Sequence, residues 1–116
     1  MANTTHSRLV NVFYDTHPIS ESQVLEKLEQ TGVDTSILTV EVLQHHDQDH
    51  FGGLAATEAL AHHAQINEST HVLDLCCGLG GPARYLAYHY GCRVTGVDMN
   101  SDRLAGAVRL TERTKL

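Results

Sequence analysis

The sequence predicts an α/β protein that contains the start of a doubly wound, mostly parallel sheet, preceded by a helical N-terminal segment. Two short apolar runs, "HVLDL" at 71–75 and "RVTGV" at 93–97, have the length and composition of buried strands. A glycine-rich turn and a helical pattern lie between them. Strand, turn, helix and strand form a βαβ unit, so we expect two parallel neighbouring strands with a right-handed crossover.

The N-terminal part is predicted to be helical from its end signals. Residues 1–19 show no clear periodicity. The next stretch, 20–32, predicts a helix that begins after Ser20 as its N-cap, with Gln23 placed to close a capping box. Gly32 is placed to end this helix.

Two further helices are expected before the first strand. The short apolar stretch 38–44 predicts a helix that starts near Thr39, with a strand as the alternative. Residues 52–66 predict a longer helix entered through a pair of glycines. Its expected buried stripe consists of Leu54, Thr57, Ala61 and Ala64.

The helix between the two strands has clear ends as well. Pro82 suits its first turn and Gly91 follows its last residue. A third helical pattern, at 101–115, follows the second strand. The second half of the chain therefore alternates strands and helices.

Composition excludes several classes of function. The chain has 116 residues, 41% of them hydrophobic, and a formal net charge of −6 with scattered basic residues. Nucleic acid and anionic membranes need a basic patch, so neither is an expected partner. The sequence shows no signal peptide and no membrane-spanning stretch. Cys76, Cys77 and Cys92 do not form a disulfide framework, and we expect a reducing cytoplasmic location.

The strongest functional signal is the glycine turn together with a carboxylate on each side of it. Gly78 and Gly80 lie in the strand-to-helix turn, where glycine allows positive φ and close approach of a ligand to the main chain. Asp98 ends the second strand, 24 residues after Asp74 on the first strand. A carboxylate at that strand end can accept hydrogen bonds from a ribose diol. These residues predict a nucleoside site.

Two classes of cofactor compete for this site. Gly78, Gly80 and Ala83 satisfy the dinucleotide pattern G-x-G-x-x-A, so an NAD-type dinucleotide or another nucleotide is one alternative. However, the carboxylate of Asp74 would repel a pyrophosphate and would suit a cationic ligand. S-adenosylmethionine carries an ammonium group, a sulfonium and a ribose diol, and no phosphate.

The stretches "VLDLCCGLGGPARYLA" at 72–87 and "GCRVTGVDMN" at 91–100 resemble the first two motifs of class I S-adenosylmethionine-dependent methyltransferases. The glycine turn is most similar to that of small-molecule enzymes of the sarcosine/dimethylglycine, phosphoethanolamine and tocopherol type. The resemblance implies a Rossmann-like sheet and methyl transfer to a small molecule. It implies a helical segment at 1–53 and the first part of the cofactor-binding domain at 54–116.

The resemblance also implies roles for individual residues. Asp74 would help to hold the methionine ammonium, and the backbone of Gly78 and Gly80 would pack against the cofactor. Asp98 would bind the ribose hydroxyls, and Met99 would lie on the adenine.

Cys76 stands where the family often has glycine. A small residue can serve at that position if its backbone is not in a conformation that only glycine adopts.

The histidine-rich run His45–His50, "HHDQDH", has three interpretations. Its ligand spacing is poor for a metal site, so we predict that it binds no metal. The following glycine pair favours a solvated polar loop. The resemblance implies instead a segment that folds over the methionine end of the cofactor. Its candidate residues are Gln48, His50, Phe51 and Gly52.

The sequence identifies neither the methyl acceptor nor a catalytic base, and Tyr14 and His17 are the candidates from the N-terminal segment. The rival hypothesis is a non-catalytic nucleotide-binding module.

Only two strands of the family's larger sheet are found. Both are apolar throughout, as is typical of strands covered on both faces and paired on both edges. We therefore expect a truncated, inactive chain, or one that self-associates or swaps strands with a second copy.

Overall fold

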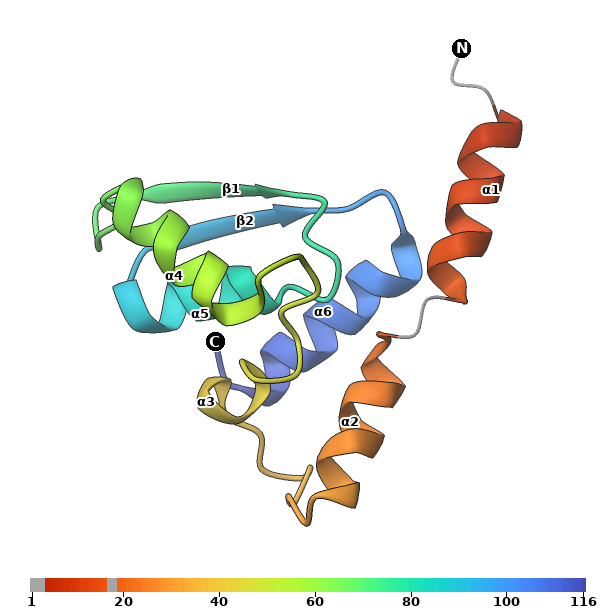
Figure 1. Ribbon diagram of the computed structural model, residues 1–116, viewed down its shortest axis with the longest axis horizontal. Helices are drawn as coiled ribbons and strands as arrows, with labels where there is room; N and C mark the ends of the chain where they lie inside the picture. The colour runs from red at the N-terminus through yellow and green to blue at the C-terminus, as the bar shows by residue number, and fades with distance from the viewer. Residues whose placement is uncertain (1–3, 17–18) are drawn as a thin grey trace.

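The computed structural model describes residues 4–16 and 19–116. Helices and strands alternate only in the second half of the chain, as the sequence predicts (Figure 1). In chain order the elements are α1 (Thr4–Asp15), α2 (Glu21–Gln30), α3 (Val40–Leu43), α4 (Gly53–His63), β1 (His71–Leu75), α5 (Gly81–Tyr90), β2 (Arg93–Val97) and α6 (Ser101–Arg113).

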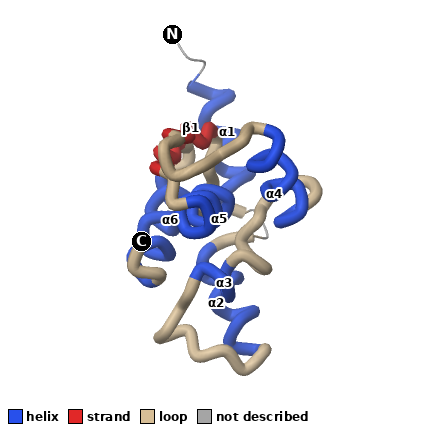
Figure 2. Tube along the Cα trace, turned by 90° about the vertical axis from the view of Figure 1, so that its left-hand side faces the viewer, coloured by secondary structure: helices blue, strands red, loops and turns tan. Residues whose placement is uncertain are grey.

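Strands β1 and β2 form a parallel pair, and α5 connects them. The register runs from His71 opposite Arg93 to Leu75 opposite Val97. Helices α4, α5 and α6 all lie on one side of the pair (Figure 1). Seen from the side, the strands are followed by α5 and α6, and then by α2 and α3 (Figure 2). The predicted βαβ unit is confirmed, and it brings the carboxyl ends of both strands to the same edge of the sheet.

The outer face of the strand pair differs from the prediction of cover on both faces. Leu73 and Leu75 are 60% and 66% exposed, and Val97 is 42% exposed. Their neighbours Val72 and Val94 face the helices and are half-buried. Within residues 4–16 and 19–116, every helix beside the sheet lies on the inner side, so the apolar outer residues stay in contact with solvent.

Helix α1 was not predicted from the sequence. Leu9, Val12 and Phe13 follow the i, i+3, i+4 spacing of one helix face. These three residues are exposed and Val10 is half-buried. The helix therefore has an apolar stripe that the sequence analysis did not recognise, and the structure leaves this stripe exposed.

The predicted ends of the next two helices are confirmed. The Ser20 hydroxyl accepts from the Gln23 amide at 3.3 Å, and the Ser20 amide donates to Gln23 Oε1 at 3.2 Å, which completes the capping box. Gly32 follows α2 with φ +80°. Thr39 caps α3 by accepting from the Val42 amide, so the stretch 38–44 is a short helix and not a strand.

Two clusters of buried apolar residues hold the elements together. The first joins α2, α3 and α6 beneath the glycine turn and contains Val24, Leu28, Leu38, Leu43, Leu79 and Leu110. The second lies between α4, α5 and β2 and contains Ala61, Tyr85, Leu86 and Cys92. The stripe predicted for α4 is wrong at one position: Ala64 is exposed because the helix ends at His63.

Two further observations bear on the composition of the chain. No helix among the described residues is long and apolar enough to cross a membrane. All three cysteines are free: Cys76 is exposed, whereas Cys77 and Cys92 are buried. The division between residues 53 and 54 stays a prediction.

Candidate functional site

The glycine turn connects β1 to α5 with a backbone that favours glycine at two positions. Gly78 has φ +54° and Gly80 has φ +74°. A Cβ atom on Gly78 would lie 3.2 Å from Arg103 Nη2, and one on Gly80 would lie 3.1 Å from Arg84 Nη1. Both glycines therefore satisfy a conformational requirement and a packing requirement, since helices α5 and α6 approach the turn closely.

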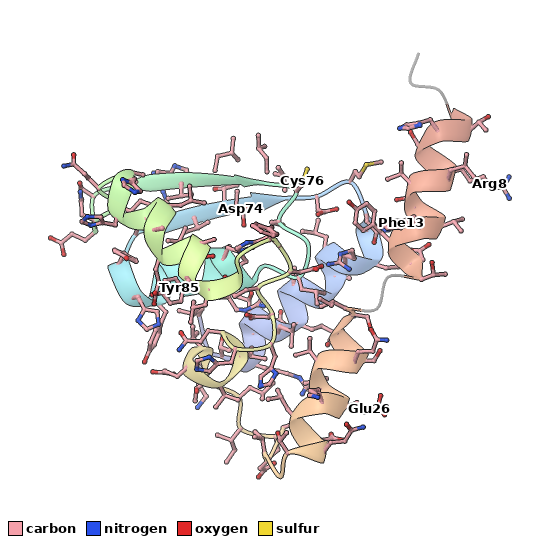
Figure 3. All side chains as sticks on the ribbon, in the orientation of Figure 1. Arg8, Phe13, Glu26, Asp74, Cys76 and Tyr85 are labelled. Carbon is pink, nitrogen blue, oxygen red and sulfur yellow. The ribbon has the colours of Figure 1, made fainter. Side chains whose placement is uncertain are left out.

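Cys76 also lies in the left-handed region, with φ +60°. This conformation favours glycine, and an L-residue in it costs roughly 1–2 kcal/mol. The position therefore carries strain with cysteine in it. The side chain is exposed beyond the end of β1 (Figure 3).

Asp98 fixes the two strand ends relative to each other. Its Oδ2 accepts from the Gly78 amide at 2.8 Å, and its Oδ1 accepts from the Asn100 amide at 2.8 Å. Each carboxylate oxygen has two lone pairs, so both retain the capacity to accept a hydrogen bond from a ligand. Met99, the next residue, is 57% exposed beside it.

Asp74, unlike Asp98, has a carboxylate oxygen that accepts no hydrogen bond from the described residues. Its Oδ2 is buried and has no hydrogen-bond partner among the described residues. Burial raises the pKa of Asp74, the charge of Asp98 raises this pKa further, and the charge of His50 opposes the shift. A buried carboxylate oxygen without a partner is costly, and a cationic hydrogen-bond donor would remove that cost.

An open cavity of about 760 Å³ lies over these residues. It brings together five of the six predicted cofactor residues, namely Asp74, Cys76, Gly78, Asp98 and Met99. Gly80 does not line it, because this glycine packs under the turn against Arg84 and Ala107. Helix α1 forms one wall through His6, Val10 and Tyr14.

The histidine-rich run lies against the turn through its two aspartates. Asp47 is 2% exposed and forms an ion pair with Arg84 of α5 at 3.0 Å. Asp49 forms an ion pair with Arg103 of α6. Among the described residues no three potential metal ligands lie together. Both aspartates therefore act as anchors to two successive helices.

The remaining candidates of this segment have different environments. His50 lines the cavity, and its Nε2 lies 3.0 Å from the Thr57 hydroxyl, which donates to Gln48 Oε1 at 2.7 Å. Phe51 is fully exposed to solvent. Gly52 has φ +83° and precedes α4. Of the two N-terminal candidates, Tyr14 lines the cavity, and His17 lies outside the described residues.

The two arginines were missed in the sequence analysis. Arg84 and Arg103 are 3% and 7% exposed. Arg103 shares the buried face of α6 with Ala107 and Leu110, at helical spacing. An arginine on a buried stripe requires a carboxylate partner, so this spacing was the available signal.

The α/β part of the chain is similar in sequence to a known domain. Residues 72–116 match the family model described as "Methyltransferase domain". This segment includes β1, the glycine turn, Asp98 and α6. The resemblance to class I S-adenosylmethionine-dependent methyltransferases is therefore confirmed for this part of the chain.

Individual relatives are named as methyltransferases too. The chain is 40% identical over 57 residues to "Methyltransferase phqN" of Penicillium fellutanum. The aligned residues make up 49% of this chain and 18% of the relative. The chain is 54% identical over 41 residues to a sterol 24-C-methyltransferase of Eremothecium gossypii, covering 35% and 11%. It is 39% identical over 51 residues to a phosphoethanolamine N-methyltransferase of Plasmodium falciparum, covering 44% and 19%. The match spans less than a fifth of each relative's length.

Proposed function

We propose that the cavity binds S-adenosylmethionine and that the chain belongs to an enzyme which methylates a small molecule. The observation that carries this proposal is the buried Asp74 Oδ2, which has no partner among the described residues. The ammonium group of the cofactor is a cationic donor of the kind that this oxygen needs. The relatives named as methyltransferases support the same activity.

The other cavity residues suit the rest of this cofactor. Asp98 would accept from the ribose hydroxyls with the lone pairs that its two backbone contacts leave over. Exposed Met99 would lie against the adenine, and the backbone at Gly78 would pack against the cofactor. The cofactor supplies an activated methyl group on its sulfonium. The task of the chain is to bind, to orient and to exclude water.

The charges around the cavity argue against a dinucleotide. The lining residues that the structure describes include four aspartates, one arginine and no lysine. The arginine is Arg103, whose guanidinium already forms an ion pair with Asp49. A pyrophosphate would therefore meet an excess of negative charge without a free arginine or lysine to neutralise it.

The same charges indicate the class of acceptor. Apart from the residues assigned to the cofactor and to the outer sheet face, the cavity wall includes Val10, Leu60 and Ile66, all apolar. We infer an acceptor that presents an apolar surface and is neutral or cationic, such as a hydrophobic amine. A phosphate-bearing acceptor would be repelled by the carboxylates, unless residues outside the described segments supplied the countercharge.

Isothermal titration calorimetry with S-adenosylhomocysteine and with NADH tests the cofactor. We expect S-adenosylhomocysteine to bind and NADH not to bind. As a control, Asp102→Asn removes an exposed carboxylate of α6 that does not line the cavity, and it should leave the binding of S-adenosylhomocysteine unchanged. Binding of NADH, or no binding of S-adenosylhomocysteine, would contradict the proposal.

We also propose that the outer sheet face mediates self-association. Leu73, Leu75 and Val97 form an apolar patch beside strand edges that have free hydrogen-bonding groups. Light scattering across a concentration series tests this, with Leu75→Lys as the variant expected to shift the chain toward the monomer. A monomer at every concentration would contradict it.

The cytoplasmic location stays a prediction.

A further inference from the structure

Arg103 is the residue at which the cavity, the histidine-rich run and the N-terminal helix meet. Its side chain is almost fully buried. Its Nη1 donates to the Ile19 carbonyl at 2.7 Å, and its Nη2 contacts the Asp49 carboxylate. Its guanidinium carbon lies 5.6 Å from the centre of the Tyr14 ring, within the range of a cation–π contact. One side chain therefore contacts two regions that are far from it in the sequence, Tyr14 and Ile19 in the first and Asp49 in the second.

The same guanidinium lies directly against the cofactor turn. A Cβ atom on Gly78 would be 3.2 Å from Arg103 Nη2 and 3.6 Å from Nε. Glycine at this position leaves just enough room for the arginine. The guanidinium therefore lies between the turn and Asp49, and the position of Asp49 depends on it.

The first turn of α6 fixes the C-terminal end of α1 as well. Asn100 caps α6 by accepting from the Arg103 amide at 2.9 Å. Its Nδ2 donates to Asp15 Oδ1 at 3.0 Å and lies 3.4 Å from Asn11 Oδ1. The Asn100 amide donates to Asp98, so a continuous chain of hydrogen bonds runs from the strand end to α1.

We propose that Arg103 is a positioning residue for the cofactor site. It holds residues 47–50 and the end of α1 against the glycine turn, and it thereby places His50 next to Asp74 at the end of the cavity proposed for the amino-acid part of the cofactor. This inference rests on the proposed function. It concerns the amino-acid end alone, because the ribose and adenine contacts assigned to Asp98 and Met99 do not involve the guanidinium.

Arg109 provides a matched control on the same helix. Its guanidinium pairs with Glu21, as that of Arg103 pairs with Asp49, but it is 56% exposed and does not line the cavity. Replacing either arginine with methionine removes one charge and one ion pair from α6. A difference between the two variants therefore reports the location of Arg103 and not a general effect of charge on the helix.

The first test is hydrogen–deuterium exchange on the full chain without ligand. We expect Arg103→Met to accelerate amide exchange in the α3–α4 connection and in α1 by at least about tenfold, while β1 and β2 keep the wild-type rate. Arg109→Met should leave all of these segments unchanged. Wild-type exchange in Arg103→Met, or equal acceleration throughout the chain, would overturn the inference.

The second test compares two ligands that differ in the amino-acid part. S-adenosylhomocysteine has this part, and 5′-methylthioadenosine lacks it. We expect Arg103→Met to weaken the first ligand by about tenfold and the second by less than about twofold, and Arg103→Lys to recover part of the loss. Equal losses for both ligands, or no loss for either, would overturn the inference.

The two tests also separate this inference from the proposed function. If the wild-type chain bound neither ligand, the assignment of the cofactor would be wrong. Hydrogen exchange would then still decide whether Arg103 positions residues 47–50 and α1.

Discussion

Two regions on either side of the glycine turn differ in whether their buried carboxylate has a countercharge. The base of the turn consists of Asp47, Gly81 and Arg84. The mouth of the cavity consists of Asp74, Cys76 and the residues after β2. Both contain a partly or fully buried aspartate whose pKa is raised by burial. They differ in the partners of that aspartate.

At the base, the two buried charges are paired with each other, although Arg84 Nε is buried without a hydrogen-bond partner among the described residues. Asp47 Oδ2 binds Arg84 Nη2 at 3.0 Å, and its Oδ1 accepts from Gln48 at 3.2 Å. Arg84 Nη1 also donates to the Ala107 carbonyl at 3.2 Å. A Cβ atom on Gly81 would lie 2.0 Å from the Asp47 carbonyl oxygen, so the two backbones are in direct contact.

At the mouth, two features are energetically unfavourable. Asp74 Oδ2 is buried without a partner among the described residues, and Cys76 adopts a left-handed conformation. Natural proteins keep such features where a ligand compensates for them. We infer from this comparison that the ion pair at the base serves stability, and we propose that the mouth serves binding. Each prediction below tests one side of it.

The largest effect is expected at the base, for Arg84→Met. Removing one partner leaves Asp47 buried without its countercharge, so the free energy of unfolding should fall by about 3–5 kcal/mol. Urea denaturation followed by circular dichroism measures this. Exposed Arg109→Met should cost at most about 1 kcal/mol. Similar losses for both variants would show that burial does not distinguish the two ion pairs.

Gly81→Ala should be the next most damaging. The added methyl group would overlap the Asp47 carbonyl oxygen, and backbone atoms cannot move away as a flexible side chain can. We expect a loss of about 2–3 kcal/mol in the free energy of unfolding. The control is Gly53→Ala, where the new Cβ atom would meet nothing within 4 Å and the only expected cost comes from φ +53°, a conformation that Gly81 does not share. A smaller loss at Gly81 than at Gly53 would contradict the contact.

At the mouth, Asp74→Asn should separate binding from stability. The affinity for S-adenosylhomocysteine should fall about tenfold to a hundredfold, as expected when a charge-assisted hydrogen bond is lost. The free energy of unfolding at pH 7 should not fall, because the variant removes a buried charge that has no partner. Calorimetry and urea denaturation on the same samples measure both. A large loss of stability would move Asp74 to the same class as Asp47.

The pH dependence of stability and of ligand affinity tests the role of Asp74 in a second way. The pKa of Asp74 is higher in the folded chain than its ordinary value of 3.8. The folded state therefore binds more protons between these two pKa values, and the stability contributed by Asp74 decreases as pH rises through that range. Affinity for a cationic ligand should increase over the same range. Asp74→Asn should remove both dependences, and their persistence in this variant would assign them to another group.

The smallest effect is expected for Cys76→Gly. Glycine adopts φ +60° without a Cβ penalty, but it also gains freedom in the unfolded chain. The net result should be a gain of about 1 kcal/mol at most, measured as a higher urea midpoint with an unchanged slope. Cys92→Gly, where the buried thiol packs between α4 and α5, should instead destabilise the chain. A loss of stability in Cys76→Gly would mean that the thiol makes a favourable contact.

The sequence predicted the mouth better than the base for a physical reason. Asp74, Gly78 and Asp98 belong to a strand–turn–helix–strand unit, so their positions follow from local geometry and the pairing of two strands. The partners of Asp47 and Asp49 are set by how α5 and α6 pack against a distant segment. The run His45–His50 therefore gave no sign of its ion pairs, and its acidic residues looked like metal ligands or solvated groups. Helix α1 was missed although Leu9, Val12 and Phe13 have helical spacing, because the stripe is short and the preceding residues are polar.

The long separation of these ion pairs has a consequence for synthesis. Asp47 and Asp49 precede Arg84 and Arg103 by 37 and 54 residues. At roughly 5–20 residues per second, the ribosome adds Arg103 about 3–11 s after Asp49. During that interval the carboxylates can interact only with water and with the residues already made. The wall of the cavity that comes first in the sequence is therefore the last to be fixed, and the emerging chain keeps it open until α6 has been made.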